Sequence, residues 1–216
     1  MATWITHMRI AEHFMNTYAS LNNDEFLVGN IAPDSGVPNE DWSVFTPDGN
    51  VSHWRGESGI DAQGFKNKYL LSPNEKWPFY LGYCFHLFTD IEWSTLFAEK
   101  EKEPVYAQGL KADPKFIWTI KKDWYGQDRV YLQKHRDSVF FNRFANIKEF
   151  PNTYLDYFPD EAFMHRIDYI TKYYLENYES ENPDRDFPFL SKEEMDCFVS
   201  DTIPILENVY KTLLRP

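Results

Sequence analysis

The stretch that decides the fold is residues 77–96, WPFYLGYCFHLFTDIEWSTL. It is mostly apolar, which predicts a long helix buried in the core. His86 and Asp90 stand four residues apart, so their side chains share one face of this helix. Burying an imidazole and a carboxylate is costly unless something compensates them, and a divalent metal is one such partner. A buried His–Asp hydrogen bond that only supports the fold is the alternative for this pair taken alone.

Three more candidate ligands precede this helix in the chain. His7 lies on the apolar stripe of a predicted helix, so its side chain should point inward. Asp34 ends an apolar run that Pro33 closes, which presents the carboxylate from a turn. His53 lies in residues 35–58, which lack periodicity and are typical of a long functional loop. The candidate metal ligands are therefore His7, Asp34, His53, His86 and Asp90. Such nitrogen and oxygen ligands suit zinc, and iron and manganese nearly as well.

The order of these residues resembles that of the bacterial zinc-dependent phospholipase C family, whose wider group includes the single-strand-specific nucleases. The pattern His, Asp, His, His-x-x-x-Asp is matched by His7, Asp34, His53 and His86 with Asp90. The resemblance implies that Asp34, His53, His86 and Asp90 bind one zinc ion. It also implies that His7 contributes to a second ion, with Asp90 as the bridge between the two.

The chain also departs from the ligand pattern of that family. The family uses an N-terminal tryptophan as a ligand, whereas this chain begins Met1-Ala2-Thr3. A downstream His-x-x-x-Glu pair, which completes a third metal site in the family, does not occur after Asp90. We therefore expect one or two ions. His135 is a potential replacement ligand, but its charged neighbours favour a surface position.

Composition limits the partners of the protein. The chain has 216 residues and a net charge of −12. An acidic surface gains nothing from counterion release on nucleic acid and repels phosphate at long range, although a metal cluster reverses the sign locally. We therefore expect neither nucleic acid nor anionic bilayers as partners, and the class of substrate that remains is small phosphoesters.

Cysteine usage and the N-terminal sequence predict the compartment. Cys84 and Cys197 belong to no ligand motif and lie in apolar helical contexts, so both are expected to be buried free thiols in a reducing environment. No basic segment followed by an apolar run begins the chain, and no window approaches the length of a membrane span. A cytoplasmic location without stable membrane association is the expectation.

The remaining pattern predicts a single all-α domain over residues 1–216. Helices are expected over residues 3–22, 24–29, 60–71, 77–99, 113–122, 127–145, 159–178 and 191–214. Ser191 and Glu194 form a capping-box start for the last of them. Gly126 is interpreted as a helix breaker, with Asp128 near a new N-terminus.

These observations favour a metal-dependent hydrolase of small phosphoesters. Asp90 and Asp34 are the expected catalytic carboxylates, while the three histidines hold the geometry of the metal. One alternative is a non-enzymatic helical protein whose metal site is structural or binds a partner. A second is a phosphohydrolase of the HD type, which requires an adjacent His-Asp pair that this chain lacks.

Overall fold

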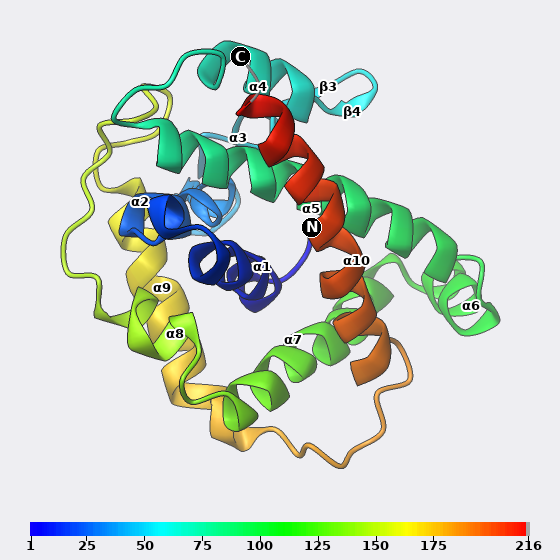
Figure 1. The fold of residues 1–216 in the computed structure, drawn as a ribbon. Helices are drawn as coiled ribbons and strands as arrows, with labels where there is room; N and C mark the ends of the chain where they lie inside the picture. Colours follow the sequence, from blue (N-terminus) through cyan, green and yellow to red (C-terminus); the bar gives the residue numbers. More distant parts are fainter. Residues whose placement is uncertain (215–216) are drawn as a thin grey trace.

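The apolar stretch around His86 forms the long helix α5 (Trp77–Lys100), as the sequence predicts. The computed structural model describes residues 1–214 and consists mostly of helices. In the view of Figure 1, α5 crosses the upper part of the molecule and α1 (Trp4–Thr17) lies in the middle of the other helices. The all-α prediction is confirmed at this level.

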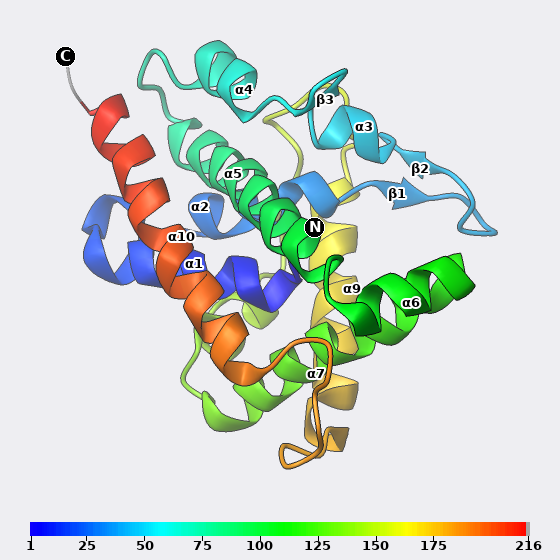
Figure 2. The ribbon, with the colours of Figure 1, turned by 90° about the vertical axis from the view of Figure 1, so that its right-hand side faces the viewer.

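Helices α1, α2 (Asp24–Gly29), α4 (Ala62–Tyr69) and α10 (Lys192–Leu213) all contact α5. Contact on several sides explains why α5 is apolar around most of its circumference. Figure 2 shows α10 crossing α1 beside α5. The helix α10 begins with the predicted capping box, in which Ser191 and Glu194 satisfy each other's backbone N–H groups.

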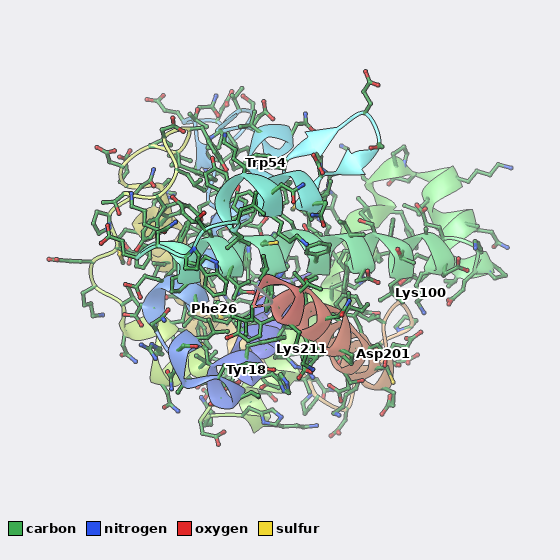
Figure 3. The ribbon with its side chains drawn as sticks, turned by 45° about the horizontal axis from the view of Figure 1, so that its top comes forward. Tyr18, Phe26, Trp54, Lys100, Asp201 and Lys211 are labelled. Atoms are coloured by element: carbon green, nitrogen blue, oxygen red, sulfur yellow. The ribbon has the colours of Figure 1, made fainter. Side chains whose placement is uncertain are left out.

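The helices α2 and α5 approach each other closely because two glycines face the contact. A Cβ atom on Gly82 would lie 2.3 Å from the carbonyl oxygen of Phe26, and one on Gly29 would lie 2.3 Å from that of Phe79. Figure 3 shows Phe26 and Trp54 on opposite sides of α5. The close approach brings the backbone after α2 against the middle of α5.

The segment between α2 and α4 is ordered without long elements. It contains η2 (Ala32–Asp34), β1 (Val37–Pro38), β2 (Phe45–Thr46), α3 (Gly49–Ser52), β3 (Arg55–Gly56) and β4 (Gly59–Ile60). The strands form two antiparallel pairs, in which Val37 is opposite Thr46 and Gly56 is opposite Gly59. The β1–β2 hairpin projects away from the helices (Figure 2). The predicted aperiodic segment is therefore a series of turns, single-turn helices and very short strands.

The second half of the chain differs most from the sequence prediction. Its elements are α6 (Pro104–Ala112), η3 (Pro114–Phe116), α7 (Ile117–Lys134), α8 (Val139–Asn142), η4 (Phe144–Asn146), α9 (Ala162–Asn177) and η5 (Tyr178–Ser180). The sequence analysis missed α6. It also predicted two helices, 113–122 and 127–145, where α7 runs without a break and ends before α8.

Tertiary contacts explain why α7 continues through Gly126. A Cβ at this position would lie 2.5 Å from Nη2 of Arg185 and 2.7 Å from the ring of Phe187, so the missing side chain admits a packed loop. Asp128 is not at a helix start. Its carboxylate accepts hydrogen bonds from Thr3 Oγ1 (2.6 Å) and from the hydroxyl of Tyr174 (2.5 Å). Asp128 therefore ties α7 to the start of α1 and to α9.

The two cysteines are both free, but only Cys84 is buried. Cys197 is exposed on α10, so its predicted burial is wrong; the apolar residues near it in sequence lie on the other face of the helix. His135 is exposed, as expected, and so is His165 on α9. Among residues 1–214, no helix combines the length and the hydropathy that crossing a membrane requires.

We expect the α2–α5 contact to tolerate no added methyl group. Gly82→Ala should lower the free energy of unfolding by about 1–3 kcal/mol because the new Cβ overpacks the interface. Gly56→Ala is the matched control, since a Cβ there meets nothing within 4 Å. Urea unfolding of both variants checks this, and equal stabilities would contradict the packing argument.

Burial raises the pKa of Asp128 from 3.8 to about 7, despite its hydrogen bonds to Thr3 and Tyr174. Between pH 3.8 and about 7 the folded protein keeps a proton on Asp128 that the unfolded chain releases. The free energy of unfolding therefore decreases as the pH rises. Asp128→Asn has no titrating group at this position, so it should not show this decrease.

Relative to wild type, Asp128→Asn should therefore become more stable as the pH increases from 5 to 8, by on the order of 1–3 kcal/mol. Urea unfolding at both pH values measures the difference. Asp201→Asn, an exposed change on α10, is the control. A difference between Asp128→Asn and wild type that stays constant or shrinks with pH would count against the buried acid.

Candidate metal centre

The structure brings the five candidate ligands to one buried place. His7 lies on α1, Asp34 ends η2, His53 follows α3, and His86 and Asp90 lie on α5. The side chains of His7, His86 and Asp90 are 0% exposed, and that of His53 is 4% exposed. His53 thus points inward although it comes from the aperiodic segment. Ligands on α1 and α5 are far apart in the sequence, and the packing of these two helices brings them together.

Four ligand atoms follow one another at separations typical of neighbouring metal ligands. Oδ1 of Asp34 is 3.3 Å from Nε2 of His53, which is 3.6 Å from Oδ2 of Asp90. The same Oδ2 is 3.5 Å from Nε2 of His86. A tetrahedral zinc ion with bonds of about 2.0–2.1 Å separates its ligands by about 3.3–3.4 Å. The ligand atoms form two groups, Asp34 with His53 and His86, and His7 with His86 and Asp90. Within each group they all lie within 4.8 Å of one another, so each group could hold an ion.

The polar atoms of this group are not satisfied by the protein itself. Nε2 of His53, Nε2 of His86 and Oδ2 of Asp90 are buried and have no hydrogen-bond partner within residues 1–214. Leaving such groups unpaired costs free energy, so something outside the polypeptide is needed to compensate them. A bound divalent cation would supply the missing partner for these nitrogen and oxygen atoms. Imidazole nitrogens and carboxylate oxygens are ligands that suit zinc.

The other oxygen of Asp90 faces a second imidazole. Nε2 of His7 is 3.5 Å from Oδ1 of Asp90, and the His7 and His86 rings stack with centroids 3.8 Å apart. The same Oδ1 accepts a hydrogen bond of 2.8 Å from the backbone N–H of Ala2. Because its two oxygens face different imidazoles, Asp90 has the geometry of a bridging carboxylate.

Outer hydrogen bonds orient His86, His53 and Asp34, whereas neither ring nitrogen of His7 has a hydrogen-bond partner among residues 1–214. Nδ1 of His86 lies 2.8 Å from the carbonyl oxygen of Asn30, and Nδ1 of His53 lies 3.1 Å from that of Gly49. A carbonyl only accepts, so these contacts place the proton on each Nδ1 and leave the lone pair of each Nε2 for a metal; the hydroxyl of Ser52, 3.0 Å from Nδ1 of His53, is then a second acceptor. The indole N–H of Trp4 donates to Oδ2 of Asp34 at 2.9 Å, which leaves Oδ1 directed at His53.

A second network holds the backbone around His53. The hydroxyl of Tyr83 donates to the carbonyl oxygen of Ser52, and the indole N–H of Trp54 donates to the hydroxyl of Tyr157 at 3.1 Å. Trp54 has a φ of 51°, a left-handed conformation that is rare for a bulky residue and is maintained here by packing. Sequence analysis did not identify this network, because no local pattern relates the residues that form it.

The electrostatics favour the metal-binding protonation states of His7, Asp34 and Asp90, whereas Asp90 and Asp34 outweigh burial and raise the pKa of His86. Burial, together with the neighbouring His86, lowers the pKa of His7 to about 4, so its imidazole is neutral at pH 7. Burial opposes ionisation of Asp90, but His86 and His7 outweigh it and hold the pKa of Asp90 well below its usual range. The pKa of Asp34 is also lowered, against burial, by the imidazoles of His53 and His86. Neutral imidazoles and ionised carboxylates are the forms that bind metals.

A cavity of about 450 Å³ lies next to this group, and Asp34 and His53 form part of its wall. The rest of the wall is largely aromatic, and its basic side chains are Lys121 on α7 and Arg166 on α9. A metal held by Asp34 and His53 would therefore be next to space for a small molecule. The sequence analysis assigned no role to Lys121 or Arg166, which come from distant helices.

Comparison of the chain with protein-family models, with curated proteins and with solved structures finds no match. The assignment of the candidate site therefore rests on two observations. One is the geometry of this structure, and the other is the resemblance of its ligand order to that of the zinc-dependent phospholipase C family.

We expect the purified protein to contain at least one transition metal per chain, zinc above all. His86→Ala and Asp90→Ala should each abolish binding, because both remove an atom from the shared set of ligands. Elemental analysis after dialysis measures the metal content, with His165→Ala, an exposed histidine, as the control.

Loss of a metal that binds only the folded state should also lower the melting temperature of wild type. Adding zinc back to the depleted protein should restore it, whereas the His86→Ala variant should not respond. A wild-type protein that contains no metal and melts at the same temperature with and without zinc would exclude the site.

Proposed function

We propose that the protein is a zinc-dependent hydrolase of small phosphate esters, with a metal centre like that of the zinc-dependent phospholipases C. The observation that carries the proposal is the series of four ligand atoms, 3.3–3.6 Å between neighbours, of which Asp34 and His53 lie in the wall of a cavity. Structural zinc sites are closed by protein ligands, whereas catalytic sites border space for water and substrate.

The chain's residues divide into three tasks in this proposal. His53, His86 and Asp34 would hold the first ion, and His7 would contribute to a second. Asp90, whose two oxygens face different imidazoles, would be a ligand at both positions. When bound, zinc lowers the pKa of its water so that hydroxide forms near neutral pH, and it neutralises charge on the phosphoryl oxygens.

Trp4 orients one of these ligands through its indole N–H. Its indole N–H occupies Oδ2 of Asp34, so the carboxylate cannot rotate away from His53. Loss of an outer partner of this kind typically costs about 10–100-fold in metal affinity or activity. Asp34 lines the cavity, which makes it the carboxylate closest to an incoming water.

The acidic surface favours small substrates over polymers. The net charge of −12 repels long polyanions, which need many basic contacts, whereas a small ester meets mainly the local charge of the cavity. Lys121 and Arg166 contribute positive charge at that place.

The zinc-loaded protein should hydrolyse 4-nitrophenyl phosphate, bis(4-nitrophenyl) phosphate or both. We expect a rate that increases through neutral pH as the bound water ionises, and chelation should abolish it. Trp4→Phe should lower activity or metal affinity by roughly 10-fold or more. Trp77→Phe, at the start of α5 and outside the cavity, is the matched control.

A folded, metal-loaded protein that is inert towards a panel of phosphomonoesters and phosphodiesters would contradict the hydrolase assignment. The metal would then have a structural or partner-binding role. The metal content measured on the same sample separates this outcome from simple loss of zinc.

A further inference from the structure

The cavity beside the metal centre contains two cations that the protein leaves without an acidic partner. Neither Lys121 nor Arg166 has a carboxylate oxygen within 4.0 Å in the part of the chain spanning residues 1–214. This is unexpected in a chain with 34 acidic and 22 basic residues. Burying an unpaired cation is costly, so a cavity whose wall holds two of them, the buried Arg166 and the half-buried Lys121, is suited to an anion.

Arg166 is buried, with 6% of its surface exposed, and its hydrogen bonds are incomplete. Its Nη2 donates to the carbonyl oxygen of Gly36 at 3.1 Å, while Nε has no partner among the described residues. The guanidinium lies 5.7 Å from the ring of Trp4, whose indole N–H binds Asp34. Arg166 is therefore linked by a single side chain to a candidate metal ligand.

Lys121 extends into the cavity from α7 between aromatic rings. Its ammonium lies 5.0 Å from the ring of Trp118 and 6.0 Å from that of Trp124. Aromatic faces stabilise a cation without neutralising its charge. Burial lowers the pKa of Lys121, whereas Asp34 and Asp90 act in the opposite direction, which agrees with its position near the metal centre.

We propose that Lys121 and Arg166 form an anion-recognition subsite that selects dianionic aryl phosphomonoesters over phosphodiesters. This inference rests on the proposed function and narrows its substrate class. A phosphomonoester carries up to two negative charges and a phosphodiester one, so two cations in addition to the metal favour the monoester. The aromatic part of the wall fits a flat organic group, through Trp4, Trp42, Trp118, Trp124, Tyr125 and Tyr169.

The test uses binding of a phosphonate, whose P–C bond a phosphoesterase does not cleave. Phenylphosphonate at pH 8 represents the dianion, and its monomethyl ester represents the monoanion. Calorimetric titration of the zinc-loaded protein with each ligand gives Kd, and 4-nitrophenyl phosphate turnover is measured on the same sample.

Lys121→Gln should weaken phenylphosphonate binding roughly 10-fold, as expected for loss of one charge-assisted hydrogen bond, with a smaller effect on the monomethyl ester. Lys122→Gln is the matched control, because it removes the same charge from the exposed position next in α7 and should change Kd less than about twofold. Arg166→Gln should weaken binding as well, and Arg166→Lys should restore part of it. Melting curves identify any variant that fails to fold.

Each outcome separates the subsite from the proposed function. Unchanged phenylphosphonate binding in folded Lys121→Gln and Arg166→Gln variants would overturn the subsite even if the protein hydrolyses esters. Equal losses for the dianion and the monoanion would overturn the preference for monoesters. Phosphonate binding that depends on Lys121, in a metal-loaded protein without turnover, would support the subsite and overturn the hydrolase.

Discussion

The buried carboxylate of Asp90 is the group on which the arrangement of the first hundred residues depends. It is fully buried, and imidazoles from α1, α5 and the end of α3 lie within 3.6 Å of its two oxygens. A carboxylate without compensation in such a place would cost several kcal/mol. The helices that carry the imidazoles must therefore remain in register with α5, and a shift of any one of them would expose or unpair a charge.

Close packing of α2 on α5 maintains this register from the other side. The glycines at positions 29 and 82 allow the two backbones to meet, and the carbonyl oxygen of Asn30 then reaches Nδ1 of His86. The contact thereby has two consequences, one for stability and one for chemistry. It buries apolar surface, and it directs Nε2 of His86 towards Asp90 rather than towards the backbone.

The charge distribution separates the cavity from the rest of the molecule. The protein as a whole is strongly acidic, yet Lys121 and Arg166 lie at the cavity without acidic partners in the described chain. On our proposal, the net negative charge repels polyanions at long range, whereas Lys121 and Arg166 attract a small anion into the cavity. Low dielectric inside the cavity strengthens the local interaction relative to the screened surface charges.

The sequence by itself determined the features that depend on local spacing. Four-residue spacing places His86 and Asp90 on one face of α5, and the capping box at Ser191 starts α10, because helical geometry is set by neighbours in the chain. The order of the five candidate ligands was also visible, and the resemblance to a known family suggested that they meet. The prediction from local propensity was wrong at Gly126. Glycine disfavours helix, yet α7 continues through this position.

Only the tertiary structure decided what depends on contacts between distant segments. The loop that packs on Gly126 keeps α7 continuous, and the same helix then places Asp128 against Thr3 and Lys121 in the cavity. The inward direction of His53 likewise follows from hydrogen bonds to Gly49 and from the support of the backbone of Ser52 by Tyr83. The positions of these side chains follow from packing between elements that are far apart in the sequence. Neither hydrophobic periodicity nor local propensity predicts which side chains of such elements come into contact.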